Sequence, residues 1–381
     1  MLKSRLPNVG TTIFTVMSAL ATRHGAVNLG QGFPDFQCDP RLTEAVTRAM
    51  SAGHNQYPPM SGWPALRSAI AEKIARLYEH RYDPDTEITV TAGATQAILT
   101  TILALVHAGD EAIVIEPAYD SYVPAIEMAG AIPVFVPMIR DGDDFRIPWD
   151  RVRAAVTSRT RLVILNSPNN PTGMAIGPED LAELERIVVD HGLFVLSDEV
   201  YEHMLYDDRR HESVSRRPAL AEHSVVVSSF GKTFHVTGWK VGYVAAPAAL
   251  TSEFRKVHQF NVFTVNTPMQ AAIAEYLQDP TPYETLGAFY QRKRDLFCEG
   301  LARTRLKPMH AAGTYFVLAD CSAVREGSEA SFCEWLTTEI GVAAIPLSAF
   351  YAAPREAGLV RFCFAKKDET LTLALERLAS L

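Results

Sequence analysis

Short, nearly continuous apolar runs dominate the middle of this chain. Six of them lie between residues 87 and 229, and each is rich in Val, Ile and Leu: EITVTAG, EAIVIEP, AIPVFVPM, RLVILNSP, GLFVLSDE and SVVVSS. Strands buried on both faces have this character, because helices cover both faces of a parallel sheet. The pattern therefore predicts an α/β fold built on a mostly parallel sheet.

The segments around these runs have helical character. ATQAILTTILALVHAG and LAELERIVVDHG each lie between two predicted strands. GWKVGYVAAP, from Gly238, predicts a further strand. Residues 252–278 predict a long helical region that is interrupted near Pro268, since proline cannot donate a backbone hydrogen bond.

The last hundred residues have a different character from the middle. Helix-like segments there alternate with two strand-like pieces, GTYFVLAD and LVRFCFA. We expect a smaller α+β domain over residues 276–381 and a large domain over residues 41–275. Residues 1–40 are irregular and rich in Gly and Pro, and we expect them to join the small domain.

Composition excludes several classes of function. The 381 residues carry a net charge of −8 and show no basic run, so we expect no nucleic-acid partner. No apolar stretch is long enough to span a bilayer. The five cysteines are scattered and lack zinc-ligand spacing, which favours free thiols, no metal site and a cytoplasmic location. The N-terminus imitates a short signal peptide, but Pro7 and Gly10 interrupt it.

Polar residues gather where the predicted strands end. Ligands of open α/β sheets bind beyond the carboxyl ends of the strands, so a site is expected there. The polar residues at these ends are Thr91, Thr95, Tyr119, Asn169, Asn170, Thr172, Asp198, Tyr201 and Lys232.

Three chemistries compete for Lys232, in the stretch SSFGKTFHVTGWK. A phosphate-binding loop would need a glycine five residues before Gly231, where the chain has Val226. A serine acylase would use Ser229 with Lys232, but its partner motifs are replaced by SDE and KTF. The third chemistry is a Schiff base between the lysine and a carbonyl cofactor such as pyridoxal phosphate.

Residues at the carboxyl ends of the predicted strands could meet every requirement of the third chemistry. The cofactor requires a carboxylate for its pyridine nitrogen, hydrogen-bond donors for its ring oxygen, an aromatic face, and a helix N-terminus for its phosphate. In that order, the candidates are Asp198; Tyr201 and Asn170; Tyr119; and residues 93–95 with Ser229 and Lys240.

Together these motifs resemble the class I and II aminotransferases, which are fold type I enzymes that depend on pyridoxal phosphate. Within that family the chain is most similar to the branch of methionine aminotransferases and kynurenine or glutamine transaminases. The resemblance implies a seven-stranded, mostly parallel sheet in the large domain. The motifs that carry it are NLGQGFPDF, NQYPPMSG, TAGATQA, NSPNNPTG, SDEVYEHM, SSFGKTFHVTGWKVGY and LVRFCFA.

The resemblance also implies a role for each matched residue. Lys232 would bind the cofactor covalently and then move the substrate proton, while Arg361 would bind the substrate carboxylate, with Gly32 close by. The residues implied for cofactor binding are Gly93, Ala94, Thr95, Tyr119, Asn170, Asp198, Tyr201, Ser229 and Lys240.

Members of the family are homodimers whose two sites share residues. Tyr57 matches a position that reaches the neighbouring subunit's phosphate, and Phe263 matches an aromatic residue supplied across the interface. Phe14 matches a further aromatic residue of the substrate pocket.

The implied pocket is apolar and aromatic, and it lacks a motif-matched arginine for a second carboxylate. We therefore expect methionine as the first amino donor, with aromatic amino acids, glutamine or kynurenine as others, and a 2-oxo acid as acceptor in a ping-pong reaction. A β-lyase acting on cystathionine or cysteine S-conjugates uses the same cofactor residues and stays open as the alternative.

Overall fold

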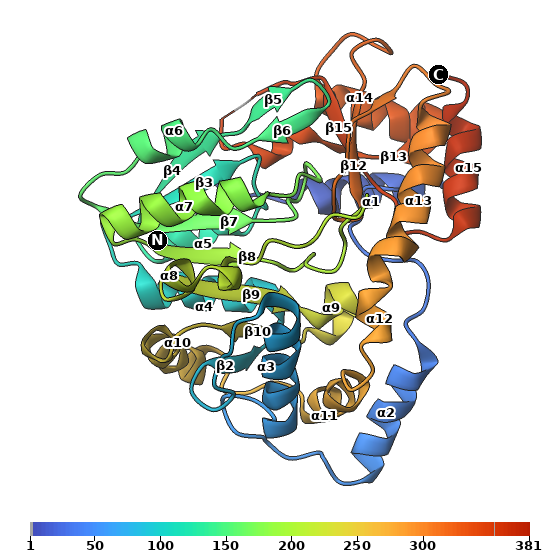
Figure 1. Cartoon of the computed structure of the whole chain (residues 1–381). Helices are drawn as coiled ribbons and strands as arrows, with labels where there is room; N and C mark the ends of the chain where they lie inside the picture. The colour runs from blue at the N-terminus through green and yellow to red at the C-terminus, as the bar shows by residue number, and fades with distance from the viewer. Residues whose placement is uncertain (1–2, 354) are drawn as a thin grey trace.

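The computed structural model describes residues 3–353 and 355–381 and contains a central seven-stranded sheet (Figure 1). The strand order is β2-β10-β9-β8-β7-β3-β4. β10 is antiparallel to both of its neighbours, and all other neighbouring strands are parallel. The α/β prediction with a mostly parallel, seven-stranded sheet is confirmed. The strands are β2 (Ile88–Thr91), β3 (Glu111–Glu116), β4 (Ile132–Pro137), β7 (Thr160–Asn166), β8 (Phe194–Asp198), β9 (Ser224–Ser229) and β10 (Gly242–Ala245).

Helices cover both faces of this sheet, which explains why its strands are apolar throughout. On one face, Ile164, Leu196 and Val227 belong to the same buried cluster as residues of α4, α5 and α10. On the other face, Val163 and Val195 pack in the cluster that contains residues of α3 and α7. The helices are α3 (Pro64–Tyr78), α4 (Gly93–Leu105), α5 (Tyr122–Met128), α6 (Trp149–Ala154), α7 (Pro178–His191), α8 (Pro218–Ala221), α9 (Phe230–Thr233) and α10 (Ala248–Asn261), with 3₁₀ turns η1 (Val214–Arg216) and η2 (Thr237–Trp239) and the hairpin β5 (Ile139–Asp141) and β6 (Asp144–Arg146).

A second sheet lies in the C-terminal part, with strand order β11-β12-β15-β14. The two strand-like pieces of the sequence are its central strands, β12 and β15, so that prediction is confirmed. The elements of this part are α12 (Thr281–Glu284), α13 (Leu286–Leu301), β11 (Lys307–Pro308), β12 (Phe316–Asp320), α14 (Glu329–Trp335), the π-turn η3 (Leu336–Ile340), β13 (Val342–Ala343), β14 (Ile345–Pro346), η4 (Leu347–Phe350), β15 (Leu359–Cys363) and α15 (Asp368–Leu378).

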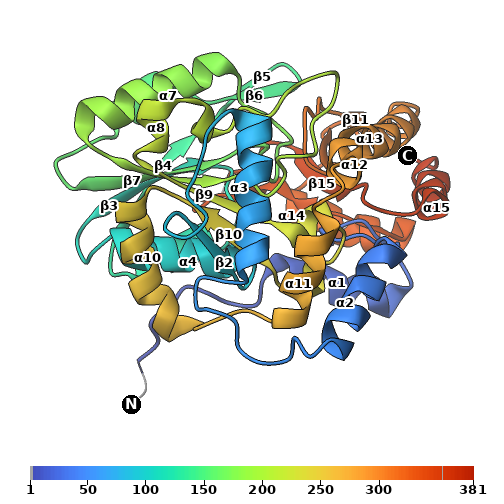
Figure 2. The same ribbon diagram turned by 60° about the horizontal axis from the view of Figure 1, so that its bottom comes forward.

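The N-terminal residues lie beside this second sheet. α1 (Ile13–His24) is close to the C-terminal elements (Figure 1), and β1 (Val27–Asn28) pairs in parallel with β13. Figure 2 shows α2 (Pro40–Ser51) next to α11 (Thr267–Tyr276), away from the central sheet. The boundaries at residues 40 and 275 stay predictions.

One local prediction is confirmed and another was wrong in position. The helical region is two helices that are interrupted near Pro268, at residues 262–266, and Pro268 itself stands in the first turn of α11. Proline suits that place, because the first N–H groups of a helix have no partner within the helix. The last strand of the sheet begins at Gly242 rather than Gly238, because a 3₁₀ turn precedes it and Lys240 has φ +54°.

Across residues 3–353 and 355–381, no helix combines the length and the apolar character that a membrane span requires.

A buried ion pair links α3 to the segment that follows β8. Lys73 Nζ donates to Glu202 at 2.7 Å, and both side chains are buried. The hydroxyls of Tyr78, Ser228 and Tyr243 donate to the same carboxylate. Burial by itself raises the pKa of Glu202, but the charge of Lys73 and these hydrogen bonds outweigh it and hold that pKa well below its usual range.

Replacement of Lys73 by methionine would leave Glu202 buried without its counterion. We expect Lys73→Met to lower the free energy of unfolding at pH 7 by about 3–5 kcal/mol, measured by urea denaturation. Lys256→Met is the control. Lys256 pairs with Glu253 on the surface, so its loss should change the free energy by less than about 0.5 kcal/mol.

The pH dependence follows from the lowered pKa of Glu202. The stability that this carboxylate contributes is present above its unfolded pKa of about 4.3 and is lost as the pH falls toward its lower folded pKa. The difference between the wild type and Lys73→Met should therefore be largest near neutrality and shrink in acid. Equal stability of the two Lys→Met variants at pH 7 would contradict this account.

Candidate active site

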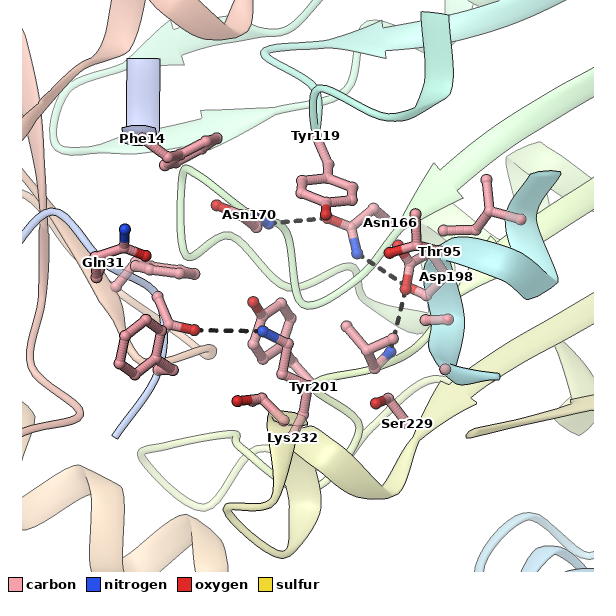
Figure 3. A pocket seen from close by; sticks show the side chains of 18 of the residues that line it. Phe14, Gln31, Thr95, Tyr119, Asn166, Asn170, Asp198, Tyr201, Ser229 and Lys232 are labelled. Atoms are coloured by element: carbon pink, nitrogen blue, oxygen red, sulfur yellow. Dashed lines mark hydrogen bonds between the residues drawn. The ribbon is translucent and has the colours of Figure 1, made fainter. Parts of the chain in front are cut away.

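A cavity of about 250 Å³ opens at the carboxyl ends of β7, β8 and β9, where the sequence predicted a site (Figure 3). One water needs only about 10–15 Å³, so the cavity can hold a small molecule. Its wall combines the start of α4 with β15, the beginning of β12 and the loop 31–33. Thirteen of the fifteen predicted site residues lie along this wall: Phe14, Gly32, Gly93, Ala94, Thr95, Tyr119, Asn170, Asp198, Tyr201, Ser229, Lys232, Lys240 and Arg361.

Lys232 projects into the cavity from α9, the short helix that directly follows β9. Its Nζ lies 2.8 Å from the hydroxyl oxygen of Tyr315 and 3.4 Å from the carbonyl oxygen of Gly32. Burial disfavours the ammonium form and lowers the pKa of Lys232 to about 8. A lysine with this pKa supplies a neutral, nucleophilic amine close to neutral pH.

Asp198 is the last residue of β8 and is buried. Burial raises its pKa to about 6, although Tyr122 opposes this shift by donating its hydroxyl to the carboxylate at 2.6 Å. Asn166 Nδ2 donates to the main-chain oxygen of Asp198 at 2.9 Å and fixes the strand end. A buried carboxylate at the wall of a cavity is suited to pair with a cationic group of a ligand.

The start of α4 is suited to hold an anion. The helix has no side-chain cap, so its first backbone N–H groups are available, and Gly93 begins it with φ +75°. A Cβ at position 93 would lie 3.2 Å from Lys240 Nζ, so the ammonium stands beside the positive end of the helix dipole. Within the described residues Lys240 forms no ion pair. A bound anion would relieve this repulsion, with Ser229 and Thr95 as neighbouring hydroxyls.

Arg361 is a buried guanidinium whose hydrogen bonds are incomplete. It donates from Nη1 to Asn170 Oδ1 at 2.7 Å and from Nη2 to the Gly30 carbonyl at 2.9 Å. Nε has no partner in the part of the chain that the structure describes. Burial lowers the pKa of Arg361 to about 10, so it stays cationic at neutral pH. A buried cation without a counterion is suited to a carboxylate ligand.

Aromatic rings surround this guanidinium. Its Cζ lies 3.9 Å from the ring centre of Phe316, 5.0 Å from that of Phe350 and 5.2 Å from that of Phe14. Stacking on rings stabilises the cation and leaves the space around it apolar. A side chain on Gly32 would not fit here, because its Cβ would lie 2.8 Å from Phe316 Cζ.

Two tyrosines stand on the cavity wall in their neutral form. Tyr119 meets Tyr122 edge to face with ring centres 5.8 Å apart, and burial raises its pKa. Tyr201 is buried, and burial raises its pKa as well. Both therefore offer hydroxyl protons to a ligand at neutral pH.

Tyr57 and Phe263 are not brought to the cavity. Tyr57 is 81% exposed and Phe263 is 39% exposed, and their rings meet edge to face with centres 5.3 Å apart. The resemblance assigned both residues to a site shared between two subunits, so a single chain would not place them in its own cavity.

Sequence reasoning missed several residues of the wall. Asn166 ends the run LVILN, and the rule that polar residues at strand ends form the site would have found it. Tyr315 is not among the residues of the wall, but it accepts a hydrogen bond from Lys232; it lies in a strand-like piece far along the chain and has no local signal. The other missed residues on the wall are Gln31, Phe33, Ile98, Val200, Thr237 and Phe316.

This set of groups suits pyridoxal phosphate. The amine of Lys232, the buried carboxylate of Asp198 and the anion site at the start of α4 line one cavity, and they match the aldehyde, pyridine nitrogen and phosphate of that cofactor.

Comparisons with known proteins agree with this chemistry. The family model for aminotransferase class I and II matches residues 24–378. The methionine aminotransferase of Escherichia coli (strain K12) is 50% identical over 380 residues, covering 100% of this chain and 98% of that protein. Kynurenine–oxoglutarate transaminase 1 of Homo sapiens is 35% identical, covering 98% of this chain and 96% of that protein.

A solved structure from Escherichia coli, described as having a methionine aminotransferase function, superimposes with a TM-score of 0.98 at 50% identity and covers 100% of both chains. The superposition covers the full length of this chain and therefore includes both sheets. The chain belongs to the class I and II aminotransferases and is a pyridoxal-phosphate-dependent enzyme.

Proposed function

We propose that this aminotransferase takes the α-amino group of methionine and passes it to a 2-oxo acid. Aromatic amino acids, glutamine and kynurenine are the further donors. The observation that carries the proposal is the buried Arg361, whose Nε has no partner among the described residues and whose guanidinium is surrounded by the rings of Phe14, Phe316 and Phe350. The single cation, Arg361, would bind the α-carboxylate, and the apolar surroundings favour a substrate with a thioether or aromatic side chain. The named activities of the Escherichia coli and human relatives support methionine and kynurenine among these donors.

Each residue of the cavity then has a defined task. Arg361 binds the substrate carboxylate and so fixes the α-carbon, and Lys232 Nζ removes the α-proton and holds it. Asp198, ionised above its pKa of about 6, keeps a proton on the pyridine nitrogen. When bound, pyridoxal phosphate supplies an aldehyde for amines and a ring that accepts the electron pair released at the α-carbon.

The remaining predicted residues would hold the cofactor in place. The backbone of residues 93–95, the hydroxyl of Ser229 and the ammonium of Lys240 would bind its phosphate. Tyr119 would stack on its ring. Asn170 Oδ1 is taken by Arg361, which leaves Nδ2 to donate to the ring oxygen together with the Tyr201 hydroxyl.

A panel of donors tests this proposal. The purified holoenzyme is mixed with L-methionine, L-aspartate, L-cystathionine or methioninol, first without and then with a 2-oxo acid. We expect methionine alone to remove the visible band of the bound cofactor and to yield one equivalent of its keto acid per site. Aspartate should react far more slowly, because a second carboxylate would be buried without a cation.

Arg361→Lys is the informative variant for the same panel. Loss of one charged hydrogen bond should lower kcat/KM for methionine roughly 10- to 150-fold. It should barely affect methioninol, which lacks the carboxylate. Arg153→Lys is the control, because Arg153 pairs with Asp190 on the surface. Continuous release of pyruvate from cystathionine, with methionine inert, would instead identify a β-lyase. A preference for aspartate would overturn the substrate assignment.

We also propose that the chain works as a homodimer with shared active sites. Tyr57, Phe260 and Phe263 are large side chains exposed by 81%, 90% and 39%, which is unusual for a surface facing only water. A second copy covering them would place Tyr57 at the neighbouring cofactor phosphate, as the resemblance implies.

Analytical sedimentation measures the oligomeric state directly. The holoenzyme should sediment with twice the mass of one chain, and Phe260→Asp should shift it toward single chains and weaken cofactor retention. Leu373→Asp introduces the same charge at an exposed apolar residue of α15 and should leave the dimer intact. A wild type that sediments as one chain at micromolar concentration contradicts the proposal.

The cytoplasm is the compartment that we propose. All five cysteines are free, and Cys321, Cys333 and Cys363 are buried. Unpaired thiols in this number are typical of a reducing environment. Detection of the protein in a cytoplasmic fraction, and its absence from the periplasm or medium, is the test.

A further inference from the structure

Tyr315 contacts the amine of Lys232 directly, although no motif marked it. It stands immediately before β12 and is completely buried. Lys232 Nζ donates to its hydroxyl oxygen at 2.8 Å, and the hydroxyl itself donates to the Gly32 carbonyl at 2.6 Å. Three residues that lie far apart in the sequence therefore meet at one hydroxyl group.

The direction of these two hydrogen bonds has a chemical consequence. A carbonyl oxygen can only accept, so the single proton of the Tyr315 hydroxyl is committed to Gly32. The hydroxyl oxygen can then only accept from Lys232. An amine that donates one N–H to Tyr315 keeps its lone pair free and directed away from the tyrosine. In this arrangement the amine is held in place while its basic site stays open.

The acceptor of the Tyr315 proton is itself held firmly. Lys366 is a buried lysine that donates to the carbonyl of Phe33 at 2.7 Å and to that of Gln31 at 3.3 Å. These carbonyls flank Gly32 on both sides. Because the peptides around Gly32 are fixed, the position of its own carbonyl is fixed, and so is the orientation of the Tyr315 hydroxyl.

The ring of Tyr315 is equally constrained. Its centre lies 5.3 Å from the ring of Tyr201, 4.8 Å from that of Phe316 and 5.7 Å from that of Tyr290. These contacts hold the Tyr315 hydroxyl in one position, so it does not follow the Lys232 amine if the lysine moves.

We propose that Tyr315 is a positioning residue, whose hydroxyl, oriented by the Gly32 carbonyl, holds the Lys232 amine with its lone pair open whenever that amine is not bonded to the cofactor. This inference rests on the proposed role of Lys232 as the group that moves the α-proton. Tyr315 exchanges no proton with the substrate. Its hydroxyl keeps the amine close to the position from which the amine reaches the α-carbon. Misplacement of a catalytic group by about 1 Å can lower the reaction rate roughly 100-fold.

The test compares Tyr315→Phe with Tyr290→Phe. The first variant keeps the ring and loses only the hydroxyl, and the Gly32 carbonyl can still accept from Lys232, so the fold should persist. The second loses a hydroxyl that is buried one ring away and has no hydrogen-bond partner among the described residues. Any general effect of removing a buried hydroxyl group should appear in both variants.

In the holoenzyme, Tyr315→Phe should lower kcat for methionine roughly 10- to 100-fold, while KM changes by less than about threefold. The isotope effect on kcat with α-deuterated methionine should rise, because proton transfer becomes the slow step. The visible band of bound cofactor should remain. Tyr290→Phe should match the wild type in all of these measurements. Unchanged kcat and isotope effect in Tyr315→Phe would overturn the proposal.

A second measurement uses the cofactor-free protein and does not depend on activity. The rate at which an amine reagent modifies Lys232 is followed against pH by mass spectrometry of the peptide. Wild-type Lys232 should titrate near its pKa of about 8. Tyr315→Phe removes an acceptor that stabilises the ammonium, so the pKa of Lys232 should fall further. The charged or titratable groups that face Lys232 are Asp198, Tyr201, Lys240, Arg361 and Cys363, and both variants retain them.

The two measurements separate this inference from the proposed function. If the wild type fails to form keto acid from any donor, the proposed function fails, yet the titration of Lys232 still reports whether Tyr315 holds its amine. An identical titration curve in the wild type and both variants would overturn the positioning role even in a fully active aminotransferase.

Discussion

Charged groups that the fold buries without complete partners are the constraint on which this structure depends. Asp198 and Arg361 are buried and Lys232 is half-buried at one edge of the sheet, and the loss of solvation shifts the pKa of each in the direction that favours its neutral form. Such an arrangement costs stability in the protein alone, since a buried charge needs a counterion and full hydrogen bonding. Large apolar clusters on both faces of the central sheet hold the edge together, and in the function that we propose the cofactor and the substrate supply the missing partners.

Two separate parts of the fold meet to make the cavity. The central sheet contributes Asp198 and Lys232 at its strand ends, and the smaller sheet contributes Arg361 in β15 and Tyr315 before β12. The bond from Arg361 to Asn170 joins the two parts directly. In the function that we propose, the cofactor site lies on one part and the carboxylate site on the other, so the relative placement of the two parts determines where a substrate α-carbon can lie. The aromatic rings around Arg361 would then contact the substrate side chain.

The sequence was most informative where a single continuous stretch of residues is enough to predict the structure. Strands buried on both faces are apolar throughout, so the sheet could be predicted, and Asp198 ends one such strand while Lys232 lies three residues after another. The contacts of Tyr315 could not be predicted, because Gly32, Lys232 and Tyr315 come together only in the folded chain. Lys366 also meets its carbonyl partners across more than three hundred residues. The interruption near Pro268 could be predicted, because proline suits the first turn of the helix that follows the break.

The most direct test of the role of Lys232 is to locate the covalently attached cofactor. The holoenzyme is reduced with borohydride, digested and analysed by mass spectrometry, with Lys240 as an internal comparison, since it lines the same cavity. We expect a pyridoxyl group on Lys232 alone, because burial keeps its amine reactive while Lys240 stands at the anion site. A pyridoxyl group on Lys240 or any other lysine, or no attachment in a protein that binds the cofactor, would contradict the central role of Lys232.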